Sequence, residues 1–225
     1  MEKKDFANAL AQAKKDSPKR NFTQSVELIV NFKNLDLKQP NQQVDLYVKL
    51  PHNRGRKTKI GALVGAELIA QAKSACDVAI SQDQFAATAS DKRKLKKMAN
   101  DVDYFLAQAN IMTDVAKHFG RILGPKGKMP NPKAGCVIPP NANIKAAIDR
   151  LTDTVRVAAK TQLSAKILVG KENQPDTEIV DNMHTIYTNV LHAVPQEANN
   201  IKNVLIKLTM GKPVHVGATV EEAKK

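Results

Sequence analysis

Near both ends of the chain, apolar and polar residues alternate with a period of two, which is typical of β-strands with one buried face. The alternating stretches are residues 25–33, 44–50, 155–157, 165–169 and 204–208. The first two follow one another along the chain, with a connection that contains Pro40. They are therefore predicted to form an antiparallel pair with one covered face.

Two segments in the same regions repeat their apolar residues at helical spacing instead. Residues 5–15 place Phe6 and Leu10 on one face, and the pattern ends before Pro18 because the residue that precedes a proline avoids the helical region. Residues 176–193 repeat the same spacing over several turns. A short amphipathic helix and a long one are therefore predicted beside the strands.

Between these regions the pattern changes, and short apolar strands alternate with helical segments. The predicted strands are 59–64, 76–80 and 104–107, and the predicted helices are 65–74, 82–100, 112–123 and 144–151. Strands and helices that alternate at this pitch favour βαβ units and a parallel sheet.

The simplest architecture is α/β in class and has two domains. Residues 1–60 and 153–225 would form one discontinuous α+β domain, and residues 61–152 would form a parallel α/β domain inserted into it. Because the chain would cross between the domains twice, a hinge near residues 60 and 153 is predicted, together with domain motion.

The charge of the chain narrows the choice of partners. Lys and Arg number 35 against 22 Asp and Glu among 225 residues, which gives a net charge of +13. Residues 61–152 hold 13 basic and eight acidic residues, so both predicted domains are basic. This balance favours a polyanionic partner, with an ordinary basic protein as the alternative. Aromatic residues make up only 4%, so contacts to phosphates and RNA shape are expected rather than base stacking.

The sequence offers little for catalysis or for a membrane. Cys76 and Cys136 are isolated, which is typical of reduced cytosolic cysteines. Residues 1–5 do not resemble a signal peptide, and no apolar run approaches about 18 residues, so a cytoplasmic protein without a membrane partner is expected. The five His lack metal-binding spacing, and Asp101 and Asp103 lack further ligands beside them. No catalytic residue, metal or cofactor is therefore expected.

Residues 124–135 form the most unusual segment, with three Pro, three Gly, three Lys and no acidic residue. Pro fixes φ and lacks the N–H donor, so a stiff, exposed and positively charged loop is predicted. The spacing does not match a P-loop or a dinucleotide fingerprint. Two interpretations stay open: an RNA-facing or interdomain loop, and a rigid connection whose lysines are solvated.

Four other segments are also open to two interpretations. Residues 92–97 hold five Lys or Arg side chains, which would form a solvated helix face or contact phosphates. Residues 54–59, at the proposed junction, would contact nucleic acid or act as a mobile hinge. Residues 20–25 and 209–211 lie at strand ends and would suit a narrow RNA groove, with ordinary turn residues as the alternative. Glu27 would accept a hydrogen bond from a 2′-hydroxyl or a base amino group.

Together these segments resemble the archaeal form of the ribosomal protein L-one family. Members of this family belong to the mobile stalk of the large ribosomal subunit. Residues 124–135 resemble the family signature. Thr209-Met210-Gly211 and Phe22-x-x-Ser25-Val26-Glu27 stand where the family has its RNA-binding patches. The resemblance covers essentially the whole chain. It implies a split β-α-β outer domain that carries the main RNA site, joined by a hinge to a Rossmann-like α/β domain.

The resemblance also implies the residues of the RNA site. Carried over by position, the main site comprises Arg20, Phe22, Ser25, Glu27, Asn203, Lys207, Thr209, Met210 and Gly211. A secondary RNA-binding or interdomain set comprises Arg54, Lys57, Lys126, Lys128 and Lys133. The family usually has Thr where this chain has Ser25, and Ser keeps the hydroxyl.

The partners that the resemblance implies are RNAs. They are the stalk element of ribosomal RNA, transfer RNA at the exit site, and a similar structure in the protein's own messenger RNA, whose translation many members repress. The protein is then expected to be a constituent of the large subunit on cytoplasmic ribosomes, a monomer when free, and not an enzyme. A nucleotide-dependent enzyme and a regulatory RNA binder that never joins ribosomes are the rival hypotheses.

Overall fold

The computed structural model describes residues 1–141 and 143–217, and the chain divides into two compact units. Met1–Arg56 and Asp153–Lys225 form the outer unit, and Lys57–Thr152 forms the inserted unit. The apolar core of the outer unit draws residues from both of its chain segments, whereas a separate core lies within the inserted unit. Each unit is therefore described by itself below.

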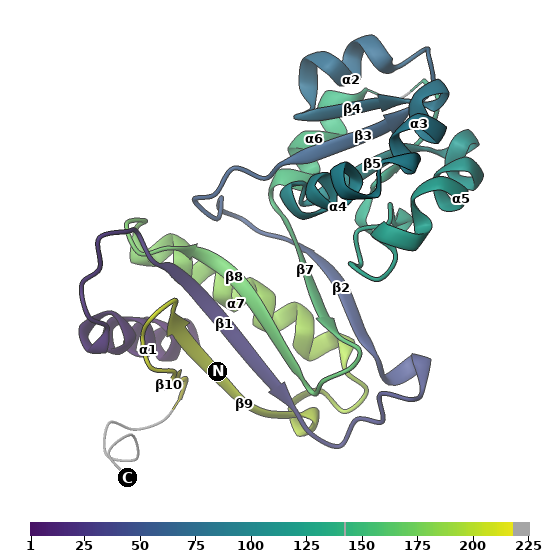
Figure 1. Ribbon diagram of the computed structural model, residues 1–225. Coiled ribbons are helices and arrows are strands. Elements are labelled where there is room, and N and C mark those ends of the chain that lie inside the picture. The colour runs from purple at the N-terminus through teal and green to yellow at the C-terminus, as the bar shows by residue number, and fades with distance from the viewer. Residues whose placement is uncertain (142, 218–225) are drawn as a thin grey trace. The chain divides into compact units, whose positions relative to one another are not determined.

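A four-stranded antiparallel sheet forms the body of the outer unit, in the order β10-β9-β1-β8 (Figure 1). Its strands are β1 (Ser25–Phe32), β8 (Ser164–Lys171), β9 (Ile201–Leu208) and β10 (Val214–His215). Strand β1 lies between β8 and β9 and pairs antiparallel with both. It therefore joins the N-terminal segment of the unit to the C-terminal segment.

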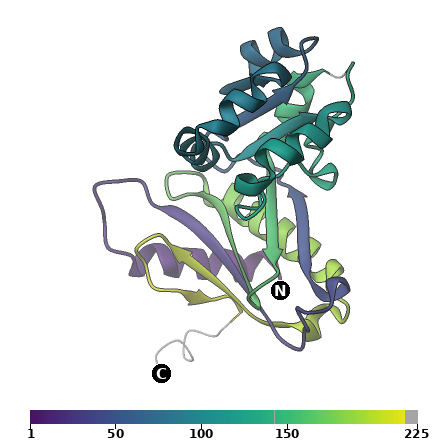
Figure 2. The ribbon, with the colours of Figure 1, turned by 45° about the vertical axis from the view of Figure 1, so that its right-hand side comes forward.

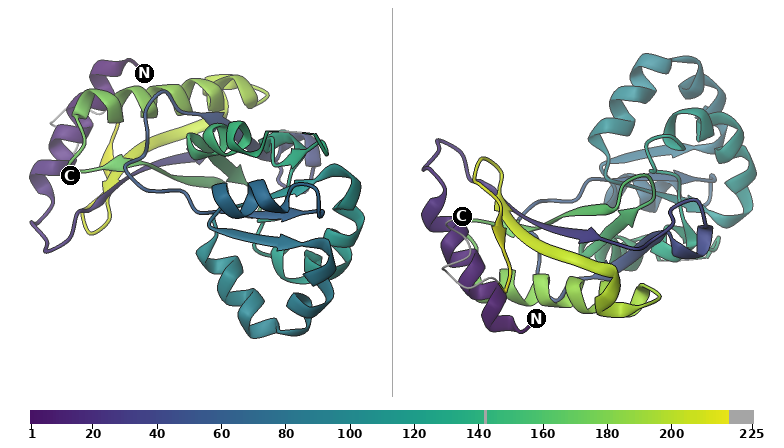
Figure 3. Two further views of the ribbon diagram at one scale, coloured as in Figure 1. Left: turned by 90° about the horizontal axis from the view of Figure 1, so that it is seen from above. Right: turned by 90° about the horizontal axis from the view of Figure 1, so that it is seen from below.

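Helices α1 (Lys3–Asp16) and α7 (Asp176–Ala193) pack against each other and cover one face of this sheet (Figure 3). Burial alternates along β1, where Val26, Leu28 and Val30 point into the core and are fully buried. The residues between them are half-buried and lie on the opposite face, here called the open face. The two predicted helices and the outer strands are confirmed, and α7 has the predicted bounds.

Strands β2 (Val44–Lys49) and β7 (Thr154–Ala159) form a separate antiparallel ribbon (Figure 2). The prediction that the first two alternating stretches pair with each other is wrong, because β8 and β9 occupy both edges of β1. Alternation shows that one face of a strand is covered but does not identify the neighbouring strand.

The β2–β7 ribbon holds an acidic side chain between two cations. Burial raises the pKa of Asp45, but hydrogen bonds from Arg156 and Lys160 lower that pKa below its usual value overall.

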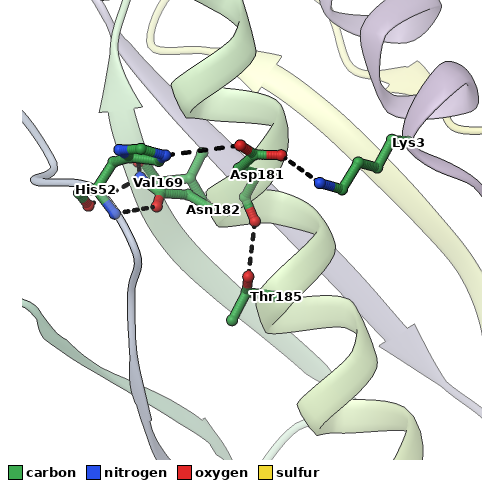
Figure 4. Close-up of polar contacts among 6 residues, drawn as sticks. All are labelled: Lys3, His52, Val169, Asp181, Asn182 and Thr185. Atoms are coloured by element: carbon green, nitrogen blue, oxygen red, sulfur yellow. Dashed lines mark hydrogen bonds and ion pairs between the residues drawn. The ribbon is translucent and has the colours of Figure 1, made fainter.

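Hydrogen bonds and an ion pair connect the segment after β2 to helix α7 (Figure 4). The buried side chain of Asn182 donates from Nδ2 to the carbonyls of His52 at 3.1 Å and Val169 at 3.0 Å. Its Oδ1 accepts from the His52 N–H at 3.1 Å. Next to it, a 2.7 Å hydrogen bond from Lys3 lowers the pKa of Asp181, whose other oxygen lies 3.6 Å from His52 Nε2. These contacts fix where the chain leaves the β2 strand.

A four-stranded parallel sheet in the order β4-β3-β5-β6 forms the centre of the inserted unit, which confirms the predicted parallel α/β arrangement. Its strands are β3 (Ile60–Val64), β4 (Val78–Ser81), β5 (Tyr104–Gln108) and β6 (Val137–Ile138). Helices α2 (Ile69–Ala75) and α6 (Ile144–Thr152) pack together on one face (Figure 1). Helices α3 (Phe85–Ser90), α4 (Lys92–Asp101) and α5 (Met112–Leu123) pack together on the other.

Single 3₁₀ turns complete the described structure. They are η1 (Pro40–Gln42), η2 (Gln82–Gln84), η3 (Ala109–Ile111), η4 (Pro132–Ala134) and η5 (Glu197–Asn200). Within the residues described, none of the helices combines the length and the apolar character that crossing a bilayer requires.

Residues 82–100 do not form the single helix that was predicted. The chain passes from η2 into α3, which ends at Ser90, and α4 begins after Asp91. The Asp91 carboxylate accepts hydrogen bonds from the backbone N–H groups of Arg93 at 3.1 Å and Lys94 at 3.0 Å. It therefore acts as the N-cap of a new helix, since an N-cap side chain satisfies the N–H groups of the first turn.

Deleting the inserted unit is expected to leave a folded outer unit. The Leu50 N–H donates to the Asp153 carbonyl at 2.9 Å, so the two chain segments that flank the deletion are already joined within the outer unit, and a flexible Gly/Ser linker would replace residues 57–152. Every residue of the outer core would remain. The variant should show one cooperative thermal transition by circular dichroism, with the intact chain as reference. A broad, non-cooperative melt would show that the outer unit depends on the inserted one.

Candidate nucleic-acid interface

The start of β1 and the end of β9 meet at one end of the outer sheet. The Ser25 N–H donates to Oγ1 of Thr209 at 2.9 Å, and the Thr209 N–H donates to the Ser25 carbonyl at 3.1 Å. Lys171, at the end of β8, donates from Nζ to the Ser25 Oγ at 2.9 Å. Three strands that are far apart in the sequence thus place two hydroxyl groups and a cation in one small area.

Gln24, which lies in the candidate segment 20–25 but was not predicted as a site residue, supports this area through hydrogen bonds. Its side chain is buried, and its Oε1 accepts a hydrogen bond from the Met210 N–H at 3.1 Å. Its Nε2 donates to Ser17 Oγ at 3.1 Å and to the Pro18 carbonyl at 3.3 Å. Gln24 occupies an inward position of the alternating pattern, and a polar residue at such a position is the signal that would have identified it.

Two large apolar side chains are exposed at the same end of the sheet. Phe22 is 50% exposed and Met210 is 54% exposed, which places them among the few exposed large apolar residues of the described chain. Gly211 lets the backbone pass close to the end of α1, because a Cβ there would lie 3.3 Å from Ser17 Oγ. We call Phe22, Ser25, Thr209, Met210 and Gly211 the strand-end patch.

A shallow hollow of about 390 Å³ adjoins the strand-end patch. Its lining residues are Lys14, Ser17, Pro18, Lys19, Arg20, Gln24, Glu172 and Leu208. Lys14 donates to the Glu172 carbonyl at 3.0 Å and pairs with Asp176, so its charge is partly compensated. Arg20, a predicted site residue, is exposed on the rim and provides a cation beside the patch.

The remaining residues of the predicted main site lie on the open face of the sheet. Glu27 and Lys207 are register partners on β1 and β9, which sets opposite charges side by side. Asn203 accepts a 2.7 Å hydrogen bond from Asn31. At about 3.3 Å of rise per residue, Asn203 lies about 20 Å along β9 from Thr209. The structure therefore places Glu27 and Lys207 next to the strand-end patch and Asn203 away from it.

The loop at residues 124–135 is less exposed than predicted. Pro130 and Ala134 are buried, and residues 132–134 form the 3₁₀ turn η4, which the Asn131 side chain caps. Lys128 is half-buried and donates from Nζ to the carbonyls of Asn100 at 3.2 Å and Val102 at 2.5 Å. These carbonyls lie at the C-terminal end of α4, where cations are favourable. Part of the loop's charge is therefore structural.

The other residues of the secondary set differ in their surroundings. Lys126 donates to the Asn100 side chain, so it too lies at the end of α4. Lys133 is exposed. Arg54 is half-buried in the outer unit, whereas the side chain of Lys57 is 85% exposed and its Nζ lies 3.4 Å from Asp77 Oδ1 in the inserted unit. The structure thus brings Lys126 and Lys128 together and assigns no common site to the whole set.

Neither cysteine is arranged for reaction. Burial raises the pKa of the Cys76 thiol to about 11 and that of the Cys136 thiol to about 11. Thiols with raised pKa values are poor nucleophiles at neutral pH. Across residues 1–141 and 143–217, no three His, Cys, Asp or Glu side chains gather as ligands for a metal ion.

Comparison of the sequence with known proteins shows the family of this chain. The sequence model of the Ribosomal protein L1p/L10e family matches residues 11–212, and the chain belongs to that family. The predicted resemblance is therefore confirmed. Because the matched family is one of ribosomal proteins, the prediction that the chain is not an enzyme is confirmed as well.

Curated archaeal relatives match over nearly the whole chain. A protein of Methanobrevibacter smithii is 38% identical over 94% of this chain and 98% of its own length. One of Methanocaldococcus jannaschii is 36% identical over 100% of both chains. One of Nanoarchaeum equitans is 39% identical over 90% of this chain and 95% of its own length. All three carry the name "Large ribosomal subunit protein uL1".

Replacing Lys128 by Met is expected to destabilise the protein, because two hydrogen bonds from a charged donor to helix carbonyls are lost. A loss of about 1–2 kcal/mol in the free energy of unfolding is expected. Urea unfolding followed by circular dichroism measures it. Lys133→Met, in the same loop but exposed, is the matched control and should change stability by less than about 0.5 kcal/mol. Equal effects of the two variants would contradict the structural role of Lys128.

Proposed function

We propose that this chain is a constituent of the large ribosomal subunit and binds ribosomal RNA through the strand-end patch. The observation that carries the proposal is the patch itself, in which hydrogen bonds hold Ser25, Thr209 and Lys171 together beside the exposed Met210. The family of the chain and the names of its relatives support the ribosomal assignment. The net charge of +13 suits an RNA partner.

Binding would be docking without a chemical step. Lys171 donates a hydrogen bond to the Ser25 hydroxyl, so the Ser25 proton is free in direction and can point to an RNA oxygen. Arg20 and Lys207 would contact phosphates at either side of the patch. Phe22 and Met210 would pack on sugars or base edges in a shallow groove.

The rigidity of the patch supports recognition of RNA shape. Hydrogen bonds hold Ser25 and Thr209 against each other, and the backbone N–H of Met210 donates to the buried Gln24. A surface that is already ordered loses little conformational entropy on binding, which favours affinity and selectivity. Such a surface reads the form of a folded RNA rather than a linear sequence.

The finer parts of the function are also proposals. We propose that the RNA target is the mobile stalk element and that the inserted unit lies beside transfer RNA at the exit site. We further propose that the chain represses translation of its own messenger RNA, because a patch that reads shape binds a second copy of that shape equally well. The free protein would be a cytoplasmic monomer until it joins the subunit.

A filter-binding titration with the stalk fragment of large-subunit RNA tests the proposal. The intact chain should prefer this fragment to a scrambled duplex of equal length. Met210→Asp should weaken binding to the stalk fragment about tenfold or more, because it places a negative charge where RNA docks. Thr209→Val is a poorer test, since it also removes the acceptor of the Ser25 N–H.

Leu163→Asp is the matched control for this titration. Leu163 is 40% exposed and precedes Ser164, which pairs with Asn31 at the opposite end of β1 from Ser25. The control introduces the same charge on the same unit and should leave the affinity within about twofold. Equal loss in both variants would move the RNA site away from the strand-end patch. Equal affinity of the intact chain for both RNAs would reduce it to a generic basic binder.

A further inference from the structure

The inserted unit carries a second concentration of positive charge that the strand-end patch does not involve. Helix α4 presents five exposed cationic side chains within its first two turns. They are Lys92, Arg93, Lys94, Lys96 and Lys97, here called the α4 ridge. The opposite side of the helix is apolar, and Leu95 and Ala99 are fully buried in the core of the inserted unit.

The α4 ridge does not stabilise its own helix. Cations near a helix N-terminus are unfavourable, because the N-terminal end carries the positive end of the helix dipole. Lys92 with Lys96, and Arg93 with Lys97, are like charges at i,i+4 spacing, which destabilises a helix. Stability instead comes from the buried Leu95 and from the Asp91 cap. The charges therefore need another explanation.

Acidic neighbours do not compensate the α4 ridge. Within residues 1–141 and 143–217, no ion pair involves any of its five members. The nearest acid in sequence, Asp91, accepts hydrogen bonds from the N–H groups of Arg93 and Lys94 as a cap. At the other end of the helix, Lys126 is held against Asn100 and adds a further cation. The positive charge of the α4 ridge is therefore available to an anionic partner outside the chain.

We propose that the α4 ridge is a second RNA-binding surface, which contacts the phosphate backbone of an RNA duplex. Its side chains project from a convex helix and include no aromatic residue, so they suit a charged backbone rather than unstacked bases. Successive i,i+4 cations lie about 6 Å apart along the axis and would follow neighbouring phosphates. Arg93 adds a planar donor group that suits phosphate oxygens.

The same observations disfavour other anionic partners. A helix that binds a membrane surface inserts its apolar face, but Leu95 and Ala99 are already buried in the protein. A protein partner would need an apolar or aromatic anchor at the centre of the interface, and the α4 ridge offers none. RNA backbone needs only charge, which the ridge provides. This inference does not depend on the strand-end patch.

The test uses the full chain and a short RNA duplex of arbitrary sequence, with affinity measured by fluorescence anisotropy at two salt concentrations. The double variant R93A/K97A should bind this duplex about tenfold more weakly, and the slope of log affinity against log salt should fall by about two. The matched control is K73A/K145A, which removes the same charge from exposed positions on α2 and α6. It should lose less than about twofold.

Two additional measurements keep the outcomes distinct. The thermal midpoint of R93A/K97A should stay equal or rise, because like-charge repulsion is relieved while affinity is lost. R93A/K97A should keep the preference of the intact chain for the stalk fragment of large-subunit RNA over a scrambled duplex, because it leaves the strand-end patch unchanged, so a failure of that patch would not be mistaken for a failure of the ridge. Equal losses in the two double variants, or no loss in either, would overturn the proposal. Binding to anionic lipid vesicles that R93A/K97A abolishes, with duplex binding intact, would also overturn it.

Discussion

The pairing of β1 with both β8 and β9 is the interaction on which the outer unit depends. β1 is one of the two inner strands of the four-stranded sheet, and the strands on either side of it come from beyond residue 163. Without β1 the sheet would separate into β8 on one side and β9 with β10 on the other. The same pairing brings Ser25 to Thr209 and Lys171, so the fold and the strand-end patch arise from one set of hydrogen bonds.

Much of the secondary structure could be predicted from the sequence, because periodicity reports directly on which face of an element is buried. The long helix α7 is the clearest case, since its apolar spacing continues to the last turn. Strand pairing could not be predicted in the same way. β1 and β2 have similar alternation, yet β2 pairs with β7, because pairing depends on contacts between residues more than 100 positions apart. The domain hinge stays a prediction.

The candidate site was only partly predictable for a related reason. Small hydroxyls, one aromatic residue and a Gly at strand ends indicated the segments around Ser25 and Met210. The role of Lys171 could not be predicted, because it appears only when the β1 start lies against β8. Gln24 lay within the candidate segment 20–25, but its contact with Met210 appears only when β1 lies against β9. Lys128 shows a different limit of the sequence. Its charge indicated an RNA contact, but the structure uses it to hold the carbonyls at the end of α4. Sequence shows where charge is, whereas only the neighbouring groups show whether that charge is available.

The central place of β1 also has a consequence for the order of events during synthesis. Strand β1 leaves the translating ribosome early, but β9 is made after almost all of the described chain, so the outer sheet cannot close until then. The inserted unit uses only residues 57–152 and can fold while the β1 segment is still waiting for partners. Ser25 meets Thr209 only at the end of this sequence. A nascent chain that stops short of β9 would therefore lack the strand-end patch, which restricts docking through it to nearly finished molecules.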